Sequence, residues 1–262
     1  GVAGVQPQSE TVWRQATKYN VPRIAFVNKM DRTGANFENA VQEMRRKLGA
    51  YAYPVVIPIG KEDYLKGVID LVNQQAIIYD DQDEVGLNYK VAEVPAEHRD
   101  RAQAALAELI DAVSNKDDEI ASLVIEDKPI DPLVLKAAIR RLTCKIELVP
   151  VLCGSAFKKK GVQPLVDAVI DYLPSPLDIP PATAHDPGDP DNAVAIPSDD
   201  HGKFCALAFK LWTDPFVGKL VFFRVYSGQL KKGDIIYNPR TRKRDRVSRV
   251  MMIQADKRID VE

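Results

Sequence analysis

One short run of residues constrains the fold of this chain more than any other, because an apolar stretch ends there abruptly in polar side chains. Residues 23–31 read Arg-Ile-Ala-Phe-Val-Asn-Lys-Met-Asp. The apolar part is short enough for a buried strand. In open α/β sheets, ligands bind just outside the carboxyl ends of such strands. The sequence therefore predicts a strand of an α/β sheet with a ligand site at its end.

The polar residues that follow this strand, Asn28, Lys29 and Asp31, have a specific chemical use. A carboxylate at Asp31 can accept two hydrogen bonds from donors that lie side by side, and the N1–H and N2–H2 groups of guanine form such a pair. Asn28 can bond the N7 edge of the base or brace the loop, and the stem of Lys29 can cover the ring. A base without these donors leaves a buried acceptor unpaired, which disfavours its binding. The alternative is a polar turn after a core strand.

A second apolar run, residues 149–153, ends in Gly154, Ser155 and Ala156. Small residues let the backbone approach a planar base, and an N–H near Ala156 can donate to the O6 of guanine. The two loops must therefore converge on one purine ring. An Asp31 carboxylate far from the Ala156 nitrogen would refute this interpretation. The predicted contacts to the base are Asn28, Lys29, Asp31, Ser155 and Ala156.

Longer segments of the chain resemble the translational GTPases, and their ordered combination resembles bacterial-type elongation factor G very closely. A single one of these motifs could be shared with ribosome-protection or peptide-release GTPases. The long insert between the two base-reading loops favours elongation factor G. The likeness is weakest near residues 80–90 and 182–202. The segments that carry it are residues 4–15, 28–34, 154–163, 171–176, 214–220 and 223–228.

This resemblance implies an α/β fold: a partial P-loop-GTPase-like sheet with an α+β insert, followed by part of an antiparallel β-barrel. The later part of the G domain is expected at residues 1–173, with the insert at about 60–145. A Pro-rich linker is expected at residues 174–202, because its composition cannot bury a core and favours an extended chain. The first part of domain II is expected at residues 203–262, where apolar residues begin to alternate.

The resemblance also implies the function. The intact protein would be a cytoplasmic GTPase that binds GTP and GDP and promotes ribosomal translocation during protein synthesis. Its partners would be ribosomal RNA and the ribosomal stalk protein, with an outer helix of the insert facing the stalk. Two alternatives stay open: a related ribosomal GTPase of the protection or release type, and a non-enzymatic ribosome- or RNA-binding module.

The phosphate-binding motifs of a GTPase do not occur in this sequence. It holds no Gly-x-x-x-x-Gly-Lys-Ser/Thr loop, and the Asp-x-x-Gly matches at Asp31, Asp83 and Asp199 follow no suitable strand. The resemblance places the phosphate loop, the switches and the catalytic histidine upstream of residue 1. We therefore expect no catalytic residue here and a role for Mg²⁺ in the intact protein only. The chain alone is expected neither to hydrolyse GTP nor to bind it tightly.

Composition excludes several other functions. The 36 basic and 37 acidic residues nearly cancel, so bulk charge predicts neither a nucleic acid nor a membrane as a partner, and no DNA partner is expected. Three cysteines are too few and too scattered for a disulfide framework or a zinc site, and indicate a reducing cytosol. The three histidines lie far apart, so no metal site is expected.

Local patterns predict most of the elements. Ser9 is expected to cap a first helix, and Asn36 and Gly49 to begin and end a second. Asp131 is expected to cap a helix of the insert that opens with Pro132. Other expected helices are residues 96–113, 117–125 and 162–173; expected strands are 54–59, 67–72, 75–79, 219–226, 234–237 and 246–253, with an acidic loop at 80–84.

Two groups of basic residues have two interpretations each. Residues 158–160, three lysines, are expected to form a solvated turn rather than to contact the nucleotide. The second group can bind a phosphate backbone or form a solubilising strand edge. Its members are Arg240, Arg242, Lys243, Arg244, Arg246 and Arg249.

Overall fold

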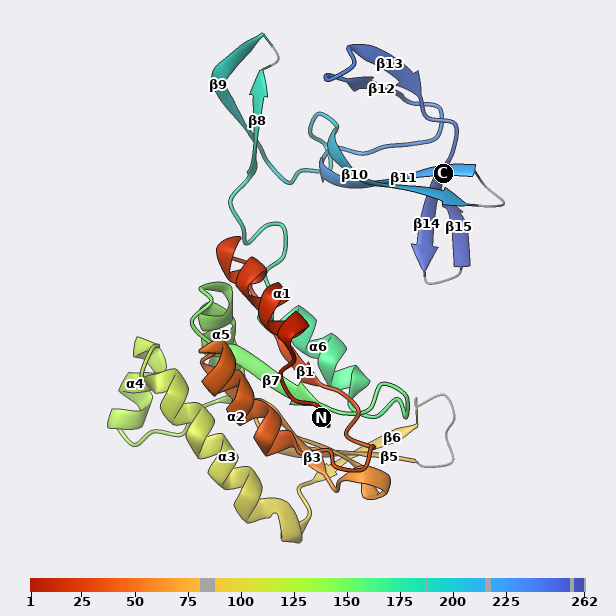
Figure 1. Cartoon of the computed structure of the whole chain (residues 1–262). Helices are drawn as coiled ribbons and strands as arrows, with labels where there is room; N and C mark the ends of the chain where they lie inside the picture. Colours follow the sequence, from red (N-terminus) through yellow and green to blue (C-terminus); the bar gives the residue numbers. More distant parts are fainter. Residues whose placement is uncertain (81–87, 187, 215–217, 255–256, 262) are drawn as a thin grey trace. The chain divides into compact units, whose positions relative to one another are not determined.

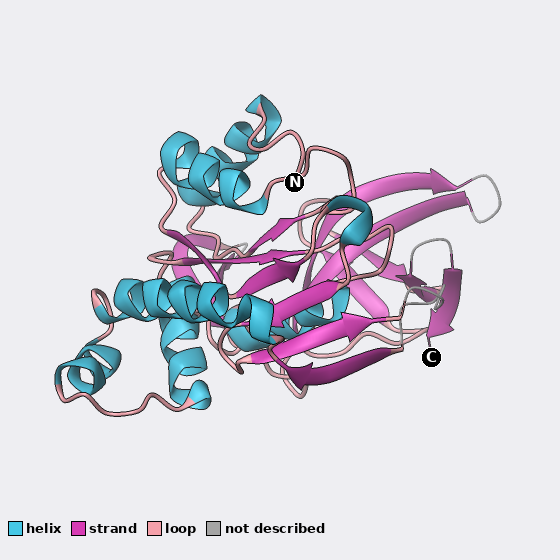
Figure 2. Cartoon of the chain, turned by 90° about the horizontal axis from the view of Figure 1, so that it is seen from below, coloured by secondary structure: helices cyan, strands magenta, loops and turns pink. Residues whose placement is uncertain are grey.

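The computed structural model describes residues 1–80, 88–186, 188–214, 218–254 and 257–261 (Figure 1). The chain divides into two compact units, Gly1–Pro174 and Ser175–Glu262. Among the described residues, the α-helices, cyan in Figure 2, all belong to the first unit. The fold class is confirmed as mixed α/β, with a parallel sheet in the first unit and antiparallel strands in both.

A three-stranded parallel sheet lies at the centre of the first unit. Its order is β1 (Ala25–Val27), β7 (Val149–Cys153) and β2 (Ala52–Pro54), and both pairings are parallel. Strand β7 is buried along its whole length. A strand covered on both faces carries apolar residues without alternation, which explains the continuous run that precedes Gly154.

A second, antiparallel sheet belongs to the insert, with β3 (Val56–Ile59), β4 (Gly67–Asp70), β5 (Gln75–Tyr79) and β6 (Tyr89–Glu93) in that order. The hairpin of β4 and β5 was predicted from the sequence, whereas β6 was not. The strand expected at 54–59 is divided at Val55, whose N–H donates to Val151 at 2.9 Å while its carbonyl accepts from Leu71 at 3.0 Å. Val55 thus joins the two sheets. Most of the acidic loop at 80–84 lies outside the described residues.

Three helices accompany the parallel sheet: α1 (Pro7–Lys18), α2 (Phe37–Leu48) and α6 (Val162–Tyr172). The expected N-cap at Ser9 is wrong: Gln6 precedes the helix and Pro7 occupies its first turn, where the missing N–H costs nothing. The caps of α2 are confirmed, since Asn36 accepts from the Asn39 N–H and Gly49 adopts φ 61°. Helix α1 buries no residue fully.

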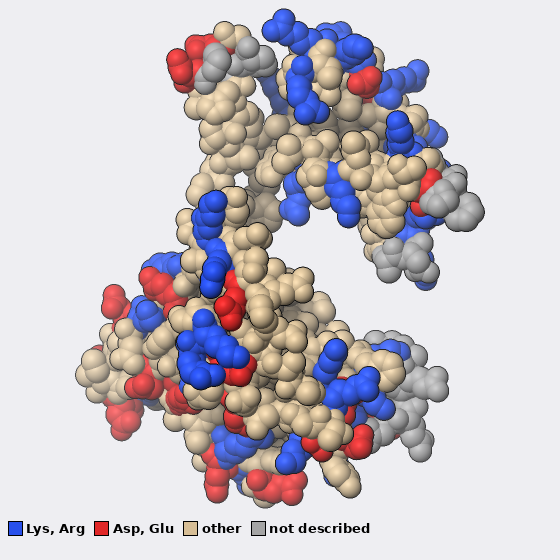
Figure 3. Space-filling model, viewed as in Figure 1, with Lys and Arg blue, Asp and Glu red and all other residues tan. Residues whose placement is uncertain are grey.

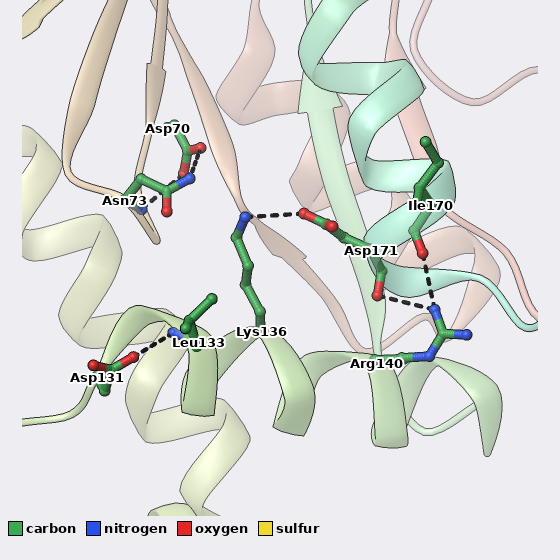
Figure 4. A network of polar contacts seen from close by, with 8 residues as sticks. All are labelled: Asp70, Asn73, Asp131, Leu133, Lys136, Arg140, Ile170 and Asp171. Atoms are coloured by element: carbon green, nitrogen blue, oxygen red, sulfur yellow. Dashed lines mark hydrogen bonds and ion pairs between the residues drawn. The ribbon is translucent and has the colours of Figure 1, made fainter.

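The insert contributes α3 (Ala96–Ser114), α4 (Asp118–Ile125), α5 (Pro132–Cys144) and the 3-10 turn η1 (Glu62–Tyr64). Asp131 caps α5 as predicted, with its carboxylate accepting from the Leu133 N–H at 2.7 Å. Figure 4 shows how α5 is joined to the end of α6. Lys136 Nζ lies 3.0 Å from Asp171, and Arg140 donates to the carbonyls of Ile170 and Asp171 at 2.9 and 3.1 Å. Cations there complement the carbonyl end of α6.

The second unit consists of antiparallel hairpins in the part of the chain that is described. One of them, β8 (Ala182–Asp186) with β9 (Asp189–Ile196), lies within residues 174–202, expected to be an extended linker. Backbone pairing makes a hairpin possible without the core that the composition lacks. The strand expected at 246–253 starts later than predicted, because β13 ends at Arg246 and β14 begins at Val250. The other strands are β10 (Cys205–Asp214), β11 (Gly218–Ser227), β12 (Ile235–Asn238), β13 (Lys243–Arg246), β14 (Val250–Gln254) and β15 (Lys257–Val261).

Candidate nucleotide-binding site

The two loops singled out in the sequence lie side by side. Because β1 and β7 are parallel neighbours, with Val27 paired to Cys153, their carboxyl ends meet at one edge of the sheet. Met30 N–H donates to the Gly154 carbonyl at 3.1 Å, and Gly154 N–H donates to the Val27 carbonyl at 3.1 Å. The predicted convergence of the loops is therefore observed.

Asn28 fastens the first loop to the second. Its Oδ1 accepts from the Lys29 N–H at 2.7 Å and from the Ala156 N–H at 3.0 Å. Of the two roles expected for Asn28, the structure thus shows the brace. The Ala156 amide, expected to face O6 of the base, donates to Asn28 instead. Lys29 has a left-handed backbone, with φ 64°, and an exposed side chain.

Asp31 carries an unpaired acceptor. Its side chain is only 9% exposed, and Oδ2 lies 3.8 Å from Arg32 Nε. The other oxygen, Oδ1, is shielded from water and has no hydrogen-bond partner among the described residues. Leaving a buried acceptor unpaired costs about 1–3 kcal/mol. A planar ligand that brings adjacent N–H donors to this carboxylate removes the penalty, and guanine is such a ligand, so the residues present fit the base.

The second loop is tight and admits little variation. A Cβ on Gly154 would lie 2.2 Å from the Lys160 carbonyl oxygen, so only glycine fits. Ser155 is fully buried and exchanges backbone hydrogen bonds with Lys160 at 2.9 and 3.0 Å. Its Oγ accepts from the Lys158 N–H at 3.1 Å. Ser155 therefore shapes the loop from inside, whereas Ala156 is exposed at its tip.

Lys160 corrects the expectation of a solvated lysine turn. Lys158 and Lys159 are exposed, but Lys160 is 7% exposed. Its Nζ donates to the carbonyl of Leu65, in the insert, at 2.7 Å. A lysine stem can pack along apolar surface while its ammonium finds a carbonyl. Nothing in the sequence distinguishes Lys160 from its two neighbours, so this contact was missed.

The insert also reaches the far end of the second loop. The Tyr79 hydroxyl of β5 donates to Gln163 Oε1, at the start of α6, at 3.0 Å. Burial raises the pKa of Tyr79 to about 12, so the hydroxyl keeps its proton to a higher pH than an exposed tyrosine would. The tyrosine thus ties the insert to the helix that follows the loop.

Other chemistry is not indicated in the described part of the chain. It contains no group of three His, Cys, Asp or Glu side chains that could hold a metal ion. No helix in it has the length and apolar character needed to cross a membrane. Burial raises the pKa of the Cys153 thiol, which packs near the Val56 carbonyl; that thiol is therefore a poor nucleophile.

The basic group of the second unit is partly accounted for by an ion pair. Arg249 donates to both carboxylate oxygens of Asp260, at 2.5 and 2.8 Å. The remaining members are exposed and lie on or beside the β12–β13 hairpin. On the face drawn in Figure 3, blue side chains gather over this hairpin. The exposed basic residues of the hairpin and its turn are Arg240, Arg242, Lys243, Arg244 and Arg246.

Comparison with known families defines the class of protein to which this fold and site belong. Residues 1–175 match the family described as the elongation factor Tu GTP binding domain, and residues 218–262 match elongation factor Tu domain 2. The first match covers more than half of the chain. The chain therefore belongs to the elongation factor Tu-type GTP-binding domain family, a family of translational GTPases.

One solved structure shows how much of a longer relative the chain represents. The chain is similar to ttk003000868 from Thermus thermophilus, with 25% sequence identity and a TM-score of 0.76. The similarity covers 99% of this chain and 35% of the Thermus chain. The chain thus spans about a third of the length of that relative.

Proposed function

We propose that this chain supplies the guanine-recognition part of a translational GTPase of the elongation factor G type. Asp31 accepts hydrogen bonds from N1–H and N2–H2 of the base, and Asn28 holds the loop and presents its amide donor to N7. Lys29 covers the ring, Ser155 shapes the second loop, and Ala156, at the tip of that loop, holds Asn28 in place through its amide. The observation that carries this proposal is the shielded Asp31 oxygen without a partner among the described residues.

The proposal divides the chain as the sequence suggested. Residues 1–173 are the later part of the G domain, with the insert at about 60–145, residues 174–202 connect, and residues 203–262 begin domain II. GTP is the substrate of the intact cytoplasmic protein, where phosphate-binding residues and Mg²⁺ supply the hydrolytic chemistry. This chain carries the site for the base only, so alone it binds nucleotide weakly and does not hydrolyse it.

Ribosomal translocation is the proposed role of the intact protein. Ribosomal RNA is a partner that the exposed arginines and lysines of the β12–β13 hairpin suit, because clustered cations bind phosphate backbones. The stalk protein is the proposed partner of an outer helix of the insert. The hairpin also favours the second candidate function, an RNA-binding module without nucleotide chemistry.

Replacing Asp31 with Asn in the intact protein tests the site. Asn replaces one carboxylate oxygen with an N–H₂ donor, which opposes a donor of guanine, so the affinity for GDP should fall about 100-fold or more. Xanthine carries an oxygen in place of the exocyclic amine, so affinity for XDP should rise. Both affinities are measured by isothermal titration at constant salt and Mg²⁺.

The matched control is Asp63→Asn, an equal change in charge at an exposed position with no bonded partner among the described residues. It should leave both affinities unchanged. Unaltered base preference in Asp31→Asn would remove the guanine site and favour the RNA-binding module.

A further inference from the structure

The first turn of the insert, residues 62–65, contacts the loop that carries Asp31. The Glu62 N–H donates to the Met30 carbonyl at 2.9 Å, and the Glu62 Oε1 accepts from the Gly34 N–H at 2.8 Å. Met30 and Gly34 stand on either side of Asp31 in the sequence. One residue of the insert thus holds the loop at both ends, through its backbone and through its side chain.

The turn itself is held in an uncommon conformation. Glu62 has φ 55°, in the left-handed region that non-glycine residues rarely adopt. Gly60, with φ 79°, leaves no room for a side chain, because its Cβ would lie 2.0 Å from the Tyr64 carbonyl oxygen. The Leu65 N–H closes the turn on the Glu62 carbonyl at 3.1 Å. Tertiary contacts, rather than local preference, therefore keep Glu62 in this geometry.

The same turn contacts the second loop. The carbonyl of Leu65 accepts from Lys160 Nζ at 2.7 Å, and Lys160 is paired through its backbone with Ser155. Residues 62–65 therefore contact both loops, one through Glu62 and the other through Leu65. The loops are also bonded to each other directly, through the Ala156 N–H to Asn28 and the Met30 N–H to Gly154. Both of these bonds precede Asp31 in the first loop, whereas Glu62 also binds Gly34, which follows it.

We propose that Glu62 is a positioning residue for base recognition, which holds Asp31 where its carboxylate meets both donors of guanine. The inference rests on the proposed function of Asp31. Glu62 does not touch the base; it acts through the Gly34 amide and the Met30 carbonyl. The insert therefore contributes to base specificity and is not only an addition to the fold.

Base selectivity in the intact protein separates positioning from general stabilisation. Inosine lacks the exocyclic amine of guanine, so the ratio of the GDP and IDP affinities reports whether Asp31 meets the second donor. Glu62→Asn tolerates a left-handed backbone, but its shorter side chain cannot reach Gly34. We expect this variant to lower the ratio of GDP affinity to IDP affinity about fivefold. This magnitude corresponds to the loss of one charge-assisted hydrogen bond next to the contact between Asp31 and the base.

Two matched variants complete the test. Glu62→Gln keeps an oxygen acceptor for the Gly34 N–H and should retain most of the ratio. Asp63→Ala removes the neighbouring exposed carboxylate and should change nothing. Hydrogen exchange at the Gly34 amide tests its bond to Glu62 in the absence of nucleotide. The exchange should be faster in Glu62→Asn than in Glu62→Gln.

Three outcomes would overturn the inference. The first is a Glu62→Asn variant that weakens GDP and IDP equally, since that shows stabilisation without positioning. The second is a Glu62→Asn variant that changes neither affinity. The third is a Glu62→Gln variant as impaired as Glu62→Asn, because charge and not the hydrogen bond would then matter. Asp31→Asn is measured alongside: if it leaves base preference unaltered, the proposed function itself fails, whereas a normal Asp31→Asn switch confines the failure to Glu62.

Discussion

The buried ammonium of Lys160 leads to a quantitative prediction about the stability of the first unit. Lys160→Ala removes about three buried methylenes, worth roughly 0.8 kcal/mol each. It also removes a hydrogen bond from a charged donor, worth about 1.5–3 kcal/mol. The desolvation of the ammonium offsets part of this sum. The free energy of unfolding should therefore fall by about 3 kcal/mol.

Lys160→Met separates the two contributions. Methionine keeps most of the apolar stem and fills irregular space, but it leaves the Leu65 carbonyl without its donor. The expected loss is about 1–2 kcal/mol. Lys158→Ala is the matched control, since Lys158 is exposed in the same run of lysines, and its effect should stay within about 0.5 kcal/mol.

The assay follows urea unfolding through tryptophan fluorescence. The chain has two tryptophans, Trp13 in the first unit and Trp212 in the second. A Trp212→Phe background leaves Trp13 as the only tryptophan, and Trp13 stacks against Arg23, two residues before β1. If Lys160→Ala costs no more than Lys158→Ala, the buried contact with the insert does not contribute as described.

Two further predictions concern the first unit. Gly154→Ala should destabilise it by more than about 3 kcal/mol, because the added Cβ meets the Lys160 carbonyl oxygen. Gly49→Ala is the control: Gly49 has φ 61° and open space around it, so the loss should be only about 1 kcal/mol. Equal losses of unfolding free energy in urea would contradict this reasoning. Hydrogen bonding to Arg141 lowers the pKa of Asp117 below its usual value of 3.8. A lowered folded-state pKa means that the stabilisation is complete above that usual value and is lost as the pH falls through the folded-state pKa. The free energy of unfolding should therefore fall more steeply from pH 5 to pH 2 in the wild type than in Asp117→Asn. Parallel curves for the two proteins would contradict a contribution of Asp117 to this pH dependence.

Much of the local structure follows from residues that are neighbours in the sequence. The apolar runs before Asn28 and Gly154 predict two strands, and Asn36, Gly49 and Asp131 were correctly identified as helix caps. Caps and apolar periodicity act over a few residues, so they can be identified without knowing the rest of the fold. The quartet from Asn28 to Asp31 is also a local signal. It indicates guanine because two adjacent donors of one base can meet a single carboxylate.

Local signals also failed where competing contacts decided the outcome. Pro7 rather than Ser9 sets the start of α1, and Val55 interrupts an apolar run because it bonds to two sheets at once. The hairpin of β8 and β9 lies in a segment whose composition suggested only an extended linker. In the last two cases, backbone hydrogen bonds outweighed composition.

By itself, the sequence determined which residues form the two loops of the candidate site and the strands that carry them. Only the tertiary structure decided what supports those loops. Lys160 reaches Leu65, 95 positions away, and Gly34 donates to Glu62, 28 positions away. No periodicity or spacing marks such contacts, because they depend on how distant segments pack. The acceptor of Asp31 is likewise unpaired among the described residues only because folding shields it from water while providing no donor.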